Sequence, residues 1–161
     1  VGVGTTFKIY LPRVAEQSEA VEIIDTSAEV PAGIETILLV EDEELVRNLS
    51  REILETCGYT VIEARNGLEA MEISENGNCK FDLLMTYVVM PEMGGRELAE
   101  ILTEKLPNIQ ILFTSGYTDD AIVRHGVIEA DTNFIQKPFT FDALARKVRE
   151  LLDAEGFKAK T

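Results

Sequence analysis

From residue 36 onward, short apolar runs alternate with amphipathic stretches. The first run, TILLV at 36–40, is followed by apolar residues at helical spacing from Leu45 to Leu54, and Gly58 supplies a helix stop. The same pattern predicts further strands at 59–63, 81–86, 109–113 and 134–136, and helices at 68–74, 98–106, 118–129 and 141–151. The helix at 118–129 is the weakest of these, because it contains Ile122, Val123 and Gly126, which are poor helix formers.

Strict alternation of five strands and five helices predicts an α/β fold. Each parallel pair needs a crossover, so the helices should cover both faces of a doubly wound, five-stranded parallel sheet. In this architecture the residues that follow the strands meet at the carboxyl edge of the sheet. The residues predicted to meet there are Glu41, Asp42, Tyr87, Ser115 and Lys137.

Composition narrows the class of partner. The chain has 161 residues, enough for one domain with extra segments, and 29 acids against 15 Lys and Arg give a net charge of -14. This charge repels phosphate backbones and anionic membranes, so we expect neither nucleic-acid binding nor direct membrane contact. Only two cysteines, Cys57 and Cys79, are present, without metal-ligand spacing, which indicates reduced thiols and a cytoplasmic chain.

Residues 13–35 are predicted to be an acidic linker. They carry six acids against the single base Arg13, a net charge of -5, without sustained periodicity, and Pro31 and Gly33 close the stretch. The chain also starts at Val1 inside a strand-like segment, and we therefore expect it to be part of a longer protein.

The residue types at the carboxyl edge suggest phosphoryl chemistry. Two adjacent carboxylates, Glu41 and Asp42, suit a hard cation such as Mg²⁺, which also takes waters and phosphate oxygens. The hydroxyl of Ser115 and the ammonium of Lys137 suit the oxygens of a phosphoryl group. Elsewhere we expect structural roles: His125 on the solvent side of its helix, and packing for the methionines, which are Met85, Met90 and Met93.

Residues 36–155 resemble the receiver (response-regulatory) domain of two-component signalling, a (βα)5 flavodoxin-like fold. The resemblance rests on four motifs in order: VEDEELVR, TYVVMPEMGG, FTSGYTD and FIQKPF. It implies that Glu41 and Asp42 bind Mg²⁺ together with the Val89 backbone carbonyl. It also implies that Ser115 and Phe134 are switch residues, and that Lys137 pairs with the phosphoryl group and precedes a cis peptide bond to Pro138.

The chain departs from the receiver pattern at the phosphoacceptor. Receivers have an Asp at the end of the third strand, where this sequence has Tyr87, and the nearest acids, Asp82 and Glu92, lie too far along the chain to replace it. A phenol with a pKa of about 10 stays neutral at pH 7, so transfer from phosphohistidine to aspartate is lost. We therefore expect weak or absent Mg²⁺ binding, pairing of Lys137 with Glu41 or Asp42, and higher stability than an Asp-bearing version.

A second resemblance concerns the first residues. GVGTTFKIYLP at 2–12 is similar to the last segment of the ATP-binding domain of histidine kinases. The expected organisation is a kinase tail at 1–12, a linker at 13–35, a receiver at 36–155 and a C-terminal tail at 156–161. This implies a hybrid sensor histidine kinase, a class of protein that can be anchored in a membrane, of which this fragment is a non-enzymatic part.

The leading hypothesis is a receiver in phosphorelay signalling that acts as a non-phosphorylatable interaction module. The resemblance implies contact with a histidine kinase, a phosphotransfer domain or a downstream signalling protein, through the helix at 118–129, the strand at 134–136 and the helix at 141–151. Three alternatives stay open. Tyr87 could replace, by chance or by engineering, the Asp of an ordinary Mg²⁺-dependent receiver, it could accept phosphate from a tyrosine kinase, or the fold could host a Mg²⁺-dependent phosphatase, although the D-x-D-x-T/V spacing of such enzymes is absent.

Overall fold

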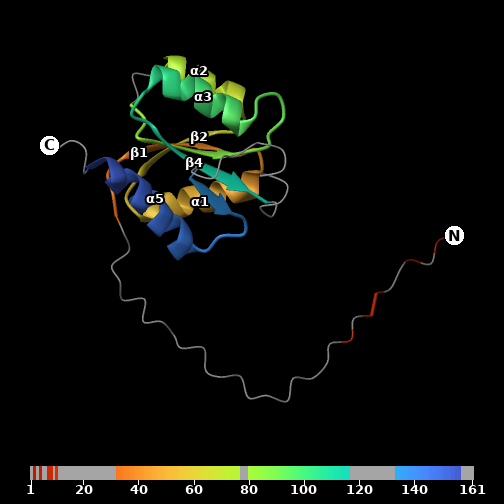
Figure 1. Ribbon diagram of the computed structural model, residues 1–161. Helices are drawn as coiled ribbons and strands as arrows, with labels where there is room; N and C mark the ends of the chain where they lie inside the picture. Colours follow the sequence, from red (N-terminus) through yellow and green to blue (C-terminus); the bar gives the residue numbers. More distant parts are fainter. Residues whose placement is uncertain are drawn as a thin grey trace, which may run out of the picture.

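The computed structural model describes residues 32–76, 80–116 and 133–156, together with Gly2, Gly4, Phe7, Lys8 and Tyr10. Five parallel strands form one sheet in the order β2-β1-β3-β4-β5 (Figure 1). The strands are β1 (Thr36–Val40), β2 (Thr60–Ala64), β3 (Leu83–Tyr87), β4 (Gln110–Ser115) and β5 (Phe134–Gln136). The described helices are α1 (Glu44–Thr56), α2 (Gly67–Asn76), α3 (Gly95–Lys105) and α5 (Phe141–Gly156).

The strand order confirms the predicted doubly wound parallel sheet. The reversal of direction along the sheet lies between β1 and β3, which is where ligands bind in folds of this kind. The helix predicted at 118–129, together with His125, lies outside the described residues, as do Cys79 and most of the linker.

Several strand boundaries differ from the predicted ones by one or two residues. β3 begins at Leu83. The preceding Asp82 contacts the start of β1, where its carboxylate Oδ2 accepts a hydrogen bond of 2.7 Å from the Thr36 amide. β4 continues to Ser115, beyond the apolar run, because Ser115 pairs with Gln136 of β5. The extension of β4 comes from a contact between strands, which a pattern along one strand does not contain.

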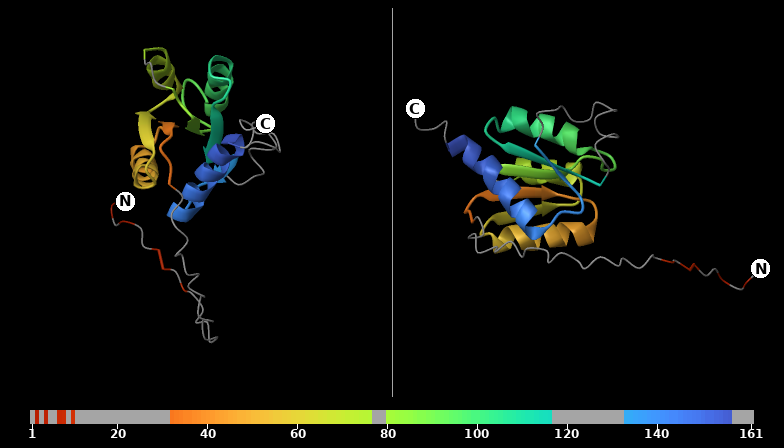
Figure 2. Two further views of the ribbon diagram at one scale, coloured as in Figure 1. Left: turned by 90° about the vertical axis from the view of Figure 1, so that its left-hand side faces the viewer. Right: turned by 60° about the horizontal axis from the view of Figure 1, so that its bottom comes forward.

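The helices cover both faces of the sheet. α1 and α5 lie on one face and α2 and α3 on the other (Figures 1 and 2). Within β1, Ile37 and Leu39 join the core beneath α1 and α5, whereas Leu38 and Val40 join the core beneath α2 and α3. A strand buried on both faces is apolar throughout, which explains the continuous run at 36–40.

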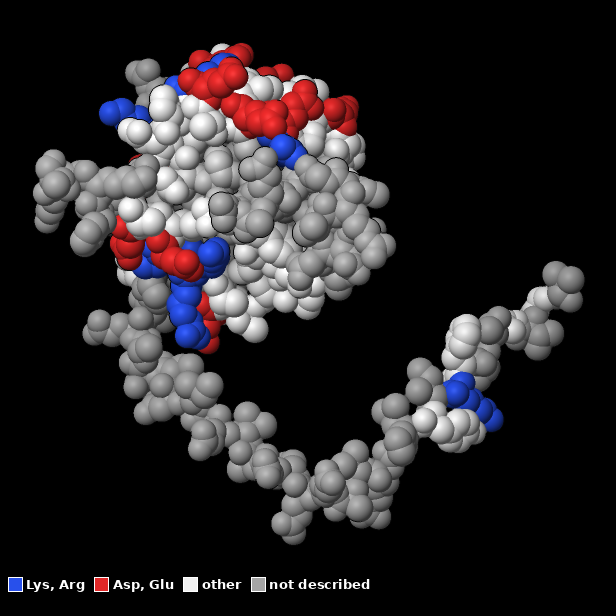
Figure 3. Space-filling model, viewed as in Figure 1, with Lys and Arg blue, Asp and Glu red and all other residues white. Residues whose placement is uncertain are grey.

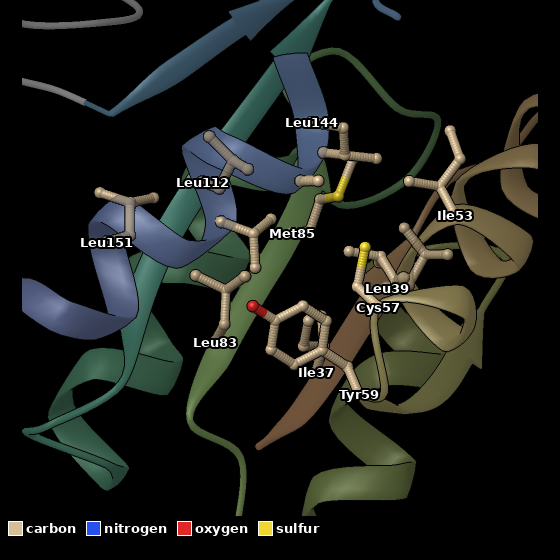
Figure 4. Packing of buried hydrophobic residues seen from close by; sticks show 13 residues of the cluster. Ile37, Leu39, Ile53, Cys57, Tyr59, Leu83, Met85, Leu112, Leu144 and Leu151 are labelled. Atoms are coloured by element: carbon tan, nitrogen blue, oxygen red, sulfur yellow. The ribbon is translucent and has the colours of Figure 1, made fainter. Parts of the chain in front are cut away.

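The core between the sheet, α1 and α5 is shown in Figure 4. Leu144 and Leu151 of α5 project toward Leu112 and Met85 of the central strands. Met85 and Met90 are buried and Met93 packs against the opposite core, which confirms the packing role predicted for the methionines. In the part of the chain that the structure describes, no helix is both long and apolar enough to cross a membrane.

Candidate functional site

The strand register brings four of the predicted residues to one edge of the sheet. Tyr87 ends β3 and pairs with Thr114 of β4, and the neighbouring Ser115 ends β4. Glu41 follows β1, and Lys137 follows β5 with its amide donating to the Ser115 carbonyl at 2.7 Å. The peptide bond between Lys137 and Pro138 is cis, as the resemblance implied.

Glu41 and Lys137 form a largely buried ion pair at the centre of this edge. The Lys137 Nζ lies 2.5 Å from the Glu41 Oε2, and the two side chains are 17% and 4% exposed. Burial raises the pKa of the Glu41 carboxyl above its ordinary value of 4.5, while the hydrogen bond and the charge of Lys137 act in the opposite direction. Without the Lys137 ammonium, a carboxylate this deeply buried would carry a large desolvation cost.

The Tyr87 ring contacts the same ammonium group. The Lys137 Nζ lies 4.1 Å from the centroid of the Tyr87 ring, within the range of a cation–π contact. The Lys137 cation therefore contacts a carboxylate and an aromatic face at once. Tyr87 is half-buried, and its ring also packs against the core beneath α2 and α3.

The two adjacent acids differ in their surroundings. Glu41 is buried and paired with Lys137, whereas Asp42 is exposed to solvent. Among the described residues, no three His, Cys, Asp or Glu side chains come together where they could hold a metal ion. At this edge, one carboxylate is therefore paired with Lys137 and the other is open to solvent.

The remaining predicted residues lie on β4, on β5 and in the loop after β3. Ser115 is 1% exposed, and Phe134 is half-buried against the core beneath α2 and α3. The loop after β3 carries Val89 on the surface, with 60% of the residue exposed. Ser115 thus lies at the predicted edge, whereas Phe134 begins β5 opposite Phe113. The roles of both as switch residues remain predictions.

Two contacts at the edge were not found from the sequence. Arg47 of α1 donates from Nη1 to the Glu41 carbonyl at 2.7 Å, fixing the backbone that carries the carboxylate. Gly95, the first residue of α3, lies so close to β3 that a Cβ atom would be 2.2 Å from the Tyr87 carbonyl oxygen. The Gly94-Gly95 pair signals a loop, and only the packed structure shows that the second glycine is required by proximity to Tyr87.

Comparison with known proteins agrees with this geometry. Residues 37–149 match the response regulator receiver domain family. The chain is 41% identical over 162 residues to the sensor kinase CckA of Brucella abortus (strain 2308), covering 96% of this chain and 17% of that protein. It is 36% identical to the response regulator receiver protein CpdR of the same organism, over 73% of this chain and 97% of CpdR.

Solved structures give the same result. The receiver domain from the hybrid histidine kinase CckA superposes with a TM-score of 0.61 at 34% identity, covering 73% of this chain and 98% of that domain. The response regulator TrrA of Thermotoga maritima, in complex with Mg(2+)-BeF, superposes with a TM-score of 0.61 at 30% identity, covering 73% and 99%. The family match, the sheet order and the residues at its carboxyl edge lead to one conclusion: the chain belongs to the response regulator receiver domain family.

Proposed function

We propose that this chain is the receiver of a hybrid sensor histidine kinase, and that it regulates by protein contact without taking a phosphoryl group at Tyr87. The alignment with CckA includes 96% of the chain, so it extends beyond the receiver into the segment preceding it. That alignment spans only 17% of CckA, and the kinase assignment of the parent protein is therefore part of the proposal.

The observation that carries the proposal is that Lys137 contacts both Glu41 and Tyr87. In a phosphorylated receiver, the resemblance assigns this lysine to the phosphoryl oxygens. Here its ammonium is held by Glu41 at 2.5 Å and by the Tyr87 ring at 4.1 Å. The lysine that would favour the phosphorylated state is thus already engaged within the chain.

The chemistry of Tyr87 supports the same proposal. Phosphorylation of a receiver from a phosphodonor needs an ionised carboxylate oxygen to attack phosphorus, and a neutral phenol is a poor nucleophile at pH 7. Mg²⁺ would normally screen the charge between the attacking oxygen and the phosphoryl group. With Glu41 committed to Lys137, Mg²⁺ binding at this edge should be weak or absent.

The proposed partners are a histidine kinase, a phosphotransfer domain or a downstream signalling protein. The proposed contact face includes β5 and α5, with Phe134 at its edge, and would continue through residues 118–129. Contact through this face requires no phosphate, so a receiver that lacks an acceptor still has a surface for partners.

The direct test is phosphorylation by a small donor. The chain, Tyr87→Asp and Tyr87→Phe are incubated with Mg²⁺ and acetyl phosphate, and their intact masses are measured. In Tyr87→Asp the new carboxylate attacks phosphorus, the bond between phosphorus and the acetate oxygen breaks, and acetate leaves. We expect one phosphoryl group on Tyr87→Asp and none on the wild-type chain or Tyr87→Phe.

A phosphoryl group on the wild-type chain, mapped to the peptide containing Tyr87, would contradict the proposal. The alternative is an ordinary Mg²⁺-dependent phosphoacceptor receiver whose Asp was replaced by Tyr87. Phosphorylation of Tyr87→Asp is expected under both readings, so it does not separate them. A source gene that encodes Asp at position 87 would favour the alternative.

A further inference from the structure

Residues 33–35, which we call the strap, connect the preceding segment to three elements of the receiver. The Gly33 amide donates to the Cys57 carbonyl after α1 at 2.9 Å. The Glu35 carbonyl accepts from the Thr60 amide of β2 at 3.0 Å. The Glu35 side chain accepts from Arg149 of α5, with 2.7 Å between Oε1 and Nη2. The strap therefore packs on the receiver at the amino end of the sheet, opposite the edge that carries Tyr87.

One carboxylate joins the strap backbone to α5. The Glu35 Oε1 accepts from Arg149, and the Oε2 accepts from the Ile34 amide at 2.8 Å. Arg149 is in turn oriented by Asp153, one turn further along α5, at 2.9 Å. A displacement of this part of α5 would therefore break or lengthen the charge-assisted hydrogen bonds that position the strap.

Close packing reinforces this connection. A Cβ atom on Gly33 would lie 2.2 Å from a Tyr59 ring carbon and 2.8 Å from the Arg149 Nη1. Gly58 adopts φ +90°, and a Cβ there would lie 2.7 Å from the Gly33 carbonyl oxygen. Tyr59 is 3% exposed and belongs to the same core as Leu151 of α5 (Figure 4). The strap thus lies against side chains that α5 also contacts.

We propose that the strap and α5 form one cooperative unit, which opens and closes together and couples α5 to the segment before the receiver. Local unfolding of proteins occurs in such contiguous units. Coupling between two sites through a shared two-state element is reciprocal, so a change at the strap is also felt at α5. This inference does not depend on Tyr87. Because α5 belongs to the partner face proposed above, binding of a partner there would also change the stability of the strap.

Amide hydrogen exchange on the full chain tests the proposal. Leu151→Ala loosens α5 from its core without touching the strap. Leu102→Ala, in α3, is the matched control, because Leu102 is equally apolar and buried but belongs to the core on the other face. We expect Leu151→Ala to speed exchange at Gly33 and Ile34 by the same factor as at the α5 amides, about tenfold or more. Leu102→Ala should change exchange at the strap much less than at α3.

A second pair of variants tests the ionic link itself. Arg149→Leu should speed exchange at Ile34 by about tenfold, because its acceptor Glu35 loses the group that positions it. Lys147→Ala is the control, since Lys147 pairs only with Glu150 within α5 among the contacts described. Faster exchange across α5 with unchanged exchange at Gly33 and Ile34 would overturn the proposal, as would equal effects of Leu151→Ala and Leu102→Ala on the strap.

Discussion

At the scale of single residues, Lys137 makes the central contacts at the carboxyl edge of the sheet. Its ammonium satisfies the buried Glu41 carboxylate and contacts the face of Tyr87. Lys137 thus neutralises one of the two carboxylates that follow β1, and Asp42 stays exposed to solvent. Each side of that arrangement can be removed separately by a single substitution.

Lys137→Met should destabilise the protein strongly at pH 7. It leaves the carboxylate of Glu41, whose side chain is 4% exposed, without its partner, and breaking such a pair typically costs about 3 to 5 kcal/mol. Urea unfolding at pH 7 measures the change. The double variant Lys137→Met with Glu41→Gln should recover much of the loss, and failure to recover would show that the packing of Lys137 matters more than its charge.

Tyr87→Asp should lower the melting temperature in the presence of EDTA. The substitution removes the ring that lies over Lys137 and places a third carboxylate beside Glu41 and Asp42, which we expect to cost about 1 to 2 kcal/mol. Tyr87→Phe keeps the ring and should stay near the wild-type value. An Asp variant that melts at or above the wild-type temperature would contradict this.

At the scale of secondary-structure elements, the start of α3 is fixed by its contact with the end of β3. Gly95 begins the helix directly beside the Tyr87 carbonyl, and its amide donates to the Val88 carbonyl at 3.0 Å. The position of Tyr87 therefore depends on a helix that begins only after the intervening loop.

Gly95→Ala should destabilise the fold, although alanine is the better helix former. The new Cβ would lie 2.2 Å from the Tyr87 carbonyl oxygen, a backbone atom that cannot move aside, and such overpacking costs about 1 to 3 kcal/mol. Gly116→Ala is the control, because a Cβ atom there would have no described atom within 4 Å. Thermal unfolding of both variants checks the difference, and equal effects would contradict the steric explanation.

The link between Glu35 and α5 should make stability depend on pH. Burial alone would raise the pKa of Glu35, but the hydrogen bond from Arg149 and those from the backbone outweigh burial and lower it below 4.5. A lowered pKa stabilises the folded state above pH 4.5, and this contribution is lost as the pH falls through the lowered value. The difference in unfolding free energy between wild type and Glu35→Gln should therefore be largest near pH 7 and shrink below pH 4.5, and a constant difference would contradict the link.

Some features of each element are visible in its own residues, and others arise only from packing. The runs at 36–40 and 134–136 match β1 and β5 residue for residue. In β1 the run reflects burial on both faces of the sheet. Glu41 and Asp42 are also recognisable in the sequence, but their opposite environments arise from how the chain turns after β1. The strap falls within the predicted linker, because its acidic composition hides the contact of Glu35 with Arg149, 114 residues away.

At the scale of the whole molecule, charge and stability are distributed unevenly. Figure 3 shows acidic side chains gathered over α2 and α3, whereas basic and acidic side chains are mixed near α5. The acids of α2 and α3 include Glu72, Glu75, Glu97, Glu100 and Glu104. The net charge of -14 is thus carried partly by one face of the receiver and partly by the segment before it.

Shortening the chain from its amino end should show which residues before β1 contribute to the stability of the receiver. Removing residues 1–31 keeps the strap, and we expect little change in the melting temperature. Removing residues 1–35 deletes the contacts of Gly33 and Glu35 and should lower the melting temperature by about 4 °C or more. Circular dichroism melts measure both, and equal melting temperatures would place the boundary of the folded unit at residue 36.

The ion pair beneath Tyr87 has a consequence for how information could pass through this receiver. A phosphorylated receiver carries a memory of an earlier event, which lasts as long as its covalent bond. Under the proposed function, a receiver that takes no phosphoryl group stores nothing, so its occupancy by a partner follows that partner's concentration relative to the dissociation constant. Any timing in its response would then be set by the synthesis, removal or rearrangement of the proteins around it.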